Sequence, residues 1–128
     1  MIMVDANVIL RFLLNDHPRL ASKAEKVIKY YGIILSKEVL AEVVYVLTGV
    51  YKISRKETAE KLVLFVRSSK VFISDKNKVI DGLKIFGSSN LDFVDSLLCA
   101  YSDVNTIATF DKKLRKCVEN KKGRLLEL

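Results

Sequence analysis

The stretch MIMVDANVIL, residues 1–10, begins as an apolar strand and then stops at a carboxylate. The pattern predicts a strand at residues 2–4, and Asp5 and Asn7 follow before apolar residues resume at Val8. An isolated ionised carboxylate is costly to remove from water. A carboxylate directly after a buried strand therefore indicates a bound partner or a chemical role.

Short apolar runs alternate with longer helical patterns along the rest of the chain. Helices are predicted at residues 18–31, 37–50, 76–86, 91–101 and 112–119, with one more helix beginning after Ser54. Further strands are predicted at residues 33–35, 71–73, 106–110 and 125–128. This alternation predicts an α/β fold, a three-layer sandwich in which helices cover both faces of a parallel sheet.

Composition favours one globular domain, residues 1–128, with a basic surface. Half of the residues are hydrophobic and 29% are charged, which is too apolar for a disordered chain. The net charge of +7 suits a polyanionic partner such as nucleic acid. No apolar run is long enough to span a bilayer, and no signal peptide pattern is present, so we expect a cytoplasmic protein without a membrane partner. Cys99 and Cys117 are expected to be free thiols in a reducing compartment.

Five acids at strand ends or on predicted helices are candidates for one shared pocket. Asp5 and Asp111 follow strands, and ligands of open parallel sheets bind beyond such strand ends. Glu42 interrupts an apolar helix, although it can equally lie on the helix surface. Asp92 is expected in the first turn of its helix, where an acid also favours the helix dipole, and Asp95 one turn deeper.

A cluster of carboxylates without a cysteine or histidine set suits Mg²⁺ or Mn²⁺ rather than zinc. Such ions activate water and stabilise the leaving oxygen in phosphodiester cleavage. The basic remainder of the chain would attract the nucleic acid backbone that the acids alone would repel. The group Lys112, Lys113, Arg115 and Lys116, directly after Asp111, is the best candidate for phosphate contacts, although such a group is often only a solvated helix face.

The order of DANV, VLAEVVYVL, LDFVDSLLCA and TFD resembles the PIN-domain family, and most of all its short VapC-type toxins. The resemblance covers nearly the whole chain. It implies that the four catalytic and metal-binding acids are Asp5, Glu42, Asp95 and Asp111. Asn7 and Thr109 match polar positions that flank the metal, and Asp92 is expected to act through water or a neighbouring side chain. Cys99 departs from the family, in which a small alanine is typical.

The resemblance further implies a mostly parallel five-stranded central sheet, a homodimer, and an antitoxin protein that covers the active site. The activity it implies is a divalent-metal-dependent endoribonuclease, the toxin of a type II toxin–antitoxin pair. Its substrate would be RNA.

Other interpretations stay open at this stage. A non-catalytic PIN-like module that binds RNA or a partner would keep the acids without using them, and a housekeeping RNA-processing nuclease would use them without an antitoxin. A phosphatase of the haloacid-dehalogenase type is disfavoured because Asn7 occupies the place of its second aspartate. A receiver domain and a P-loop enzyme are disfavoured because their motifs are absent.

Overall fold

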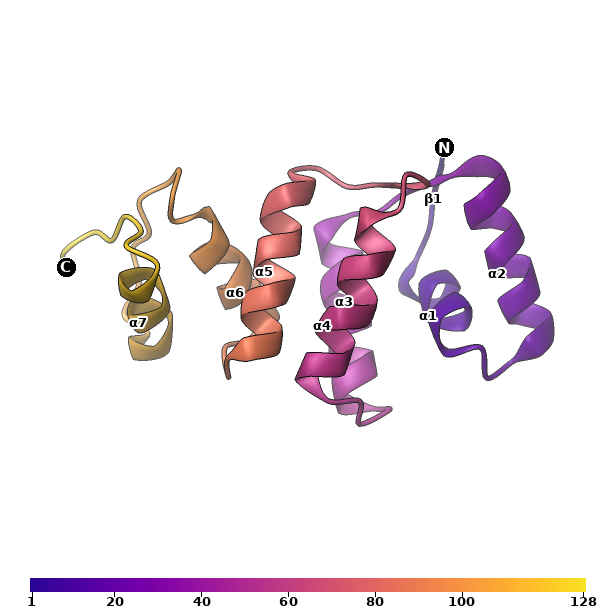
Figure 1. Ribbon diagram of the computed structural model, residues 1–128, viewed down its shortest axis with the longest axis horizontal. Helices are drawn as coiled ribbons and strands as arrows, with labels where there is room; N and C mark the ends of the chain where they lie inside the picture. The colour runs from indigo at the N-terminus through magenta and orange to yellow at the C-terminus, as the bar shows by residue number, and fades with distance from the viewer.

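Seven helices and three short strands follow one another in the computed structural model, which describes all residues from 1 to 128 (Figure 1). In chain order they are β1 (Ile2–Met3), α1 (Ala6–Leu14), α2 (Pro18–Tyr31), β2 (Ile33–Ile34), α3 (Lys37–Gly49), α4 (Arg55–Arg67), β3 (Val71–Phe72), α5 (Lys76–Ser88), α6 (Phe93–Tyr101) and α7 (Lys112–Asn120). Along the longest axis, α1 and α2 lie at one end and α7 at the other (Figure 1). None of the helices is both long enough and apolar enough to cross a bilayer.

The sheet is parallel but smaller than predicted. Its strands lie in the order β1-β2-β3, with Ile2 opposite Ile33 and Ile33 opposite Val71. The α/β class is correct, whereas the prediction of a central five-stranded sheet is wrong. Residues 106–110 and 125–128 form no strands; a single parallel bridge joins Ile107 to Leu125.

The backbone hydrogen bonds of these two segments explain why they do not join the sheet. The Ile107 amide donates to the Arg124 carbonyl at 2.8 Å, and the Leu126 amide donates to the Ile107 carbonyl at 2.9 Å. Ile107 also lies in a small core beside α6 and α7. This segment is therefore held at the α7 end of the molecule, away from β1, and the outer edge of β1 has no neighbour.

Capping side chains explain where several helices begin. The amides of Val39 and Glu57 each donate to a serine hydroxyl, Ser36 and Ser54 respectively, at 3.1 Å. The first helix was not predicted. Asp5 begins it by accepting a hydrogen bond from the Val8 amide at 3.2 Å. Such caps satisfy amides that have no partner within the helix.

Two apolar cores hold the elements together. The main core has 22 buried residues, drawn from the sheet region, α1 to α5, and the Phe93 and Leu97 side chains of α6. The second core has five residues, Leu91, Cys99, Ile107, Leu114 and Val118. Because α7 packs only through this small core, we expect its attachment to be the weaker part of the fold.

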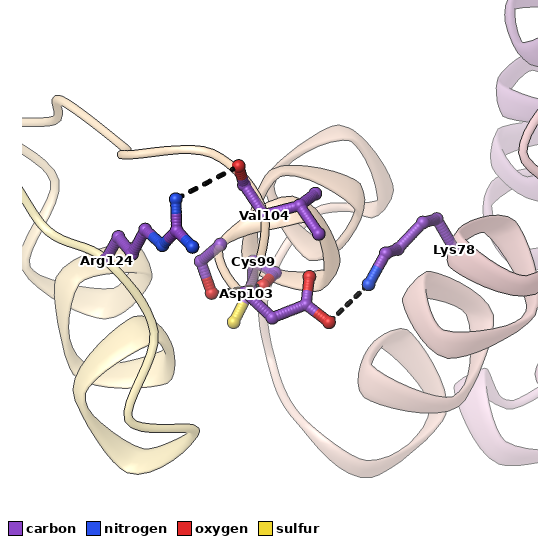
Figure 2. A network of polar contacts seen from close by, with 6 residues as sticks. Lys78, Cys99, Asp103, Val104 and Arg124 are labelled. Carbon is purple, nitrogen blue, oxygen red and sulfur yellow. Dashed lines mark hydrogen bonds and ion pairs between the residues drawn. The ribbon is translucent and has the colours of Figure 1, made fainter.

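A disulfide joins the two helices of the small core. Cys99 of α6 is bonded to Cys117 of α7, so the expectation of two free thiols is wrong. The turn after α6 is also fixed by polar contacts. Figure 2 shows Asp103 reaching Lys78 of α5, and Arg124 donating to the Val104 carbonyl at 3.4 Å, with Cys99 beside them.

Removing the disulfide should destabilise the protein. The bond closes a loop between cysteines 18 positions apart. Loss of a cross-link of this span lowers the free energy of unfolding by about 3 kcal/mol. We expect that loss for the Cys99→Ser/Cys117→Ser variant and for wild type in dithiothreitol, measured by urea unfolding. The double variant should not respond to dithiothreitol. Equal wild-type stability with and without reductant would show that the bond does not form.

Candidate active site

Three of the predicted acids line one pocket where α6 and α7 begin. The pocket has a volume of about 350 Å³, and Asp92, Asp95 and Asp111 line it. Its other lining residues are Asn90, Leu91, Lys112 and Lys113. The amino ends of the two helices carry partial positive charge, which favours carboxylates at these positions.

Asp95 is the most constrained of the three acids. Its side chain is half-buried, and burial raises the pKa of its carboxyl, with further increases from the negative charges of Asp111 and Asp92. These effects act together because each disfavours the charged form. Asp95 lies in the first turn of α6, so the prediction that it lies beyond that turn is wrong.

Hydrogen bonds hold both the side chain and the backbone of Asp111. Its Oδ1 accepts from the Leu114 amide at 2.9 Å, which caps α7. Its own amide donates to the Thr109 hydroxyl oxygen at 3.0 Å. Thr109 therefore positions Asp111, and the second carboxylate oxygen of Asp111 does not serve the cap.

Arg55 of α4 supports the loop that leads to Asp92. Its Nε donates to the carbonyls of Phe86 and Ser89, at 3.1 and 2.8 Å, and its Nη2 donates to the Leu91 carbonyl. The guanidinium also lies 3.8 Å from the centre of the Phe86 ring. Burial lowers the pKa of Arg55, and the negative charge of Asp92 opposes this shift. No pattern in the sequence pointed to Arg55, because its partners are backbone carbonyls from a distant segment.

Asp5, Asn7 and Glu42 do not line this pocket. Asp5 caps α1, and the side chains of Asn7 and Glu42 are exposed. In Figure 1, β1 and α1 lie toward the opposite end of the molecule from α7. The structure thus gathers Asp92, Asp95 and Asp111 in one pocket, which Asp5 and Glu42 do not line.

The donor chemistry of the pocket fits a hard divalent cation held by few protein ligands. No three acidic, histidine or cysteine side chains anywhere in the chain are close enough to hold one ion together. Mg²⁺ commonly keeps several waters and takes one or two carboxylates plus substrate phosphates. Asp95 and Asp111 can serve in this way, and a cation would offset the burial and the repulsion that raise the pKa of Asp95.

Neutralising Asp95 should stabilise the metal-free protein. Because its pKa is raised on folding, the folded chain binds the Asp95 proton more readily than the unfolded chain. Its carboxylate therefore reduces stability above the folded pKa and has no such effect below the unfolded value of about 3.9. We expect Asp95→Asn to raise Tm at pH 7 in EDTA, with a gain that disappears as the pH falls below 4. An unchanged or lower Tm at pH 7 would contradict the repulsion inferred here; Glu119→Gln, an exposed acid of α7 outside the pocket, is the control.

The comparisons with known proteins bear on this pocket. The family model for the PIN domain matches residues 2–119, which is nearly the whole chain. The comparison with curated proteins found no match, and the comparison with solved structures found none either. PIN domains are generally nucleases, which agrees with carboxylates gathered on a basic chain. On the extent of the family match, this chain belongs to the PIN-domain family.

Proposed function

We propose that the protein is a Mg²⁺- or Mn²⁺-dependent endoribonuclease of the cytoplasm, and that it is the VapC-type toxin of a type II toxin–antitoxin pair. The observation that carries the nuclease proposal is the shared pocket of Asp92, Asp95 and Asp111, in which the pKa of Asp95 is raised. Family membership and the net charge of +7 support a nucleic acid substrate.

The residues of the pocket have separate tasks in this proposal. Asp95 and the free oxygen of Asp111 would hold the metal ion, which supplies activation of water and stabilisation of the leaving oxygen. Lys112 and Lys113 line the same pocket and would draw a phosphate toward the acids. Asp92 is exposed and would accept hydrogen bonds from water at the pocket rim. Thr109 and Arg55 keep Asp111 and the loop before Asp92 in place.

Asp5 and Glu42 belong to the proposed catalytic set on the family pattern, with Asn7 beside Asp5. Neither acid lines the pocket, so their participation requires Asp5, at the start of α1, and Glu42, of α3, to come closer to the start of α6. Loss of cleavage in both Asp5→Asn and Glu42→Gln, with unchanged folding, would support that approach.

Purified protein should cleave single-stranded RNA with Mn²⁺ or Mg²⁺ and stop in EDTA. Asp95→Asn and Asp111→Asn should remove activity, because each loses a direct ligand. Asp92→Asn should retain some activity, reduced about 10–100-fold, as is typical when a group acts on the metal through another. The measurement is gel-resolved cleavage of a labelled RNA at saturating Mn²⁺.

The control for these variants is Glu119→Gln, which should cleave like wild type. Activity that survives EDTA, or survives in Asp95→Asn, would contradict the mechanism. RNA binding without any cleavage would favour the non-catalytic module. Cleavage without growth arrest on expression would favour a housekeeping nuclease.

We also propose a homodimer and a cognate antitoxin as partners. The dimer is supported by the unpaired edge of β1, where Met1, Ile2 and Met3 are 63%, 42% and 69% exposed. Apolar side chains on an open edge strand favour association. The antitoxin is supported by the family alone.

Light scattering at micromolar concentration should therefore give about twice the chain mass of 14.5 kDa. The Ile2→Lys/Met3→Lys variant should shift the protein toward monomer, because charges on an edge strand oppose pairing. A wild-type protein that stays at 14.5 kDa would contradict the dimer.

A further inference from the structure

A second pocket adjoins the acid pocket and extends along α7. Its volume is about 490 Å³, and it shares Asn90, Leu91 and Lys113 with the acid pocket. The two pockets are therefore adjacent. Acids line the first pocket, and no acid lines the second.

Three lysines that form no ion pair line this second pocket. They are Lys113, Lys116 and Lys121, and the charge of Lys121 also acts on Asp103. The four ion pairs of the protein involve other basic residues, Arg11, Lys29, Lys37 and Lys78. Positive charge without a partner in a concave site attracts anions, and phosphates are the anions that a nuclease must bind.

The same pocket also offers surfaces for a base and a ribose. Its apolar surface comes from Ile85 and Cys117, which are partly buried and pack on the buried Leu91 of the small core. Its polar part contains the amide side chains of Asn90 and Asn120, which can donate and accept hydrogen bonds. The hydroxyls of Ser88 and Ser89 also line it, although they already donate to the carbonyls of Lys84 and Ile85. Apolar surface, hydroxyls and amides beside lysines match an unpaired nucleotide, since single-stranded RNA presents unstacked bases to proteins.

We infer that this second pocket, the α7 pocket, binds the nucleotide next to the cleaved phosphate of a single-stranded RNA. Lys113 lies at the junction of the two pockets and would contact the phosphate between them. Lys116 and Lys121 would contact the phosphate that follows along the strand. The inference rests on the proposed nuclease function for the identity of the acid pocket, and it adds the path of the RNA along α7.

The test compares two pairs of lysine substitutions. Lys116→Gln/Lys121→Gln removes charge from the α7 pocket and spares Lys113, which also lines the acid pocket. Lys23→Gln/Lys26→Gln removes the same charge from exposed positions of α2, at the other end of the molecule (Figure 1). All four lysines are exposed, so both variants should fold.

Binding is measured by fluorescence anisotropy with a labelled ten-nucleotide single-stranded RNA, in EDTA so that no cleavage occurs. For the α7 pair we expect Kd to rise roughly fivefold, and the slope of log Kd against log salt to fall by about 1.4, which corresponds to two lost contacts with single-stranded nucleic acid. In cleavage assays KM should rise while kcat stays unchanged, because the lost contacts act equally before and during reaction. The α2 pair should match wild type.

Two results would overturn the inference: wild-type affinity in the α7 pair, or an equal loss in the α2 pair. The second result would mean that only total charge matters. A wild-type protein that binds RNA through these lysines and never cleaves it would support the α7 pocket while contradicting the nuclease proposal.

Discussion

The attachment of α7 to α6 determines which carboxylates can meet. Five buried side chains and the bond between Cys99 and Cys117 hold the two helices side by side. Asp95 lies in the first turn of one helix and Asp111 caps the other, so their attachment brings the two carboxylates into one pocket. Without it, Asp111 would lose its fixed position, since α7 takes no part in the main core. The geometry of the proposed site thus depends on a small and covalently supported contact.

The two adjacent pockets carry charge of opposite sign. In the acid pocket Asp95 is partly buried near two like charges, an unfavourable arrangement that a divalent cation would offset. The lysines of the α7 pocket supply the attraction that a polyanion needs to approach those acids. Either pocket alone has an ordinary structural explanation. The acid pocket and the α7 pocket share Lys113 and Asn90, and this adjacency is what supports a function for the two pockets together.

Local features of this chain could be predicted from sequence, and features set by distant contacts could not. The helix starts at residue 37 and after Ser54 were predicted correctly, because a helix start depends on a capping serine and a few neighbouring residues. The short run at residues 106–110 was predicted to be a strand of the sheet. Instead Ile107 pairs with Leu125 and packs in the small core, away from the sheet. The same core contains the disulfide between Cys99 and Cys117, which composition predicted to be free thiols. Asp92 and Asp95 could be placed near each other because they share a short segment, whereas the approach of Asp111 depends on that core.

The most direct measurement is the position of a bound Mn²⁺ ion, obtained by NMR from the paramagnetic broadening of backbone amide signals. If the acid pocket is the metal site, substoichiometric Mn²⁺ should first broaden the signals of residues 90–96 and 109–114, and Asp95→Asn should abolish this selectivity. Signals near Cys99 and Cys117 should broaden less than those of Asp95 and Asp111. Broadening centred on another part of the chain, or none at millimolar Mn²⁺, would contradict the assignment of this pocket as the catalytic centre.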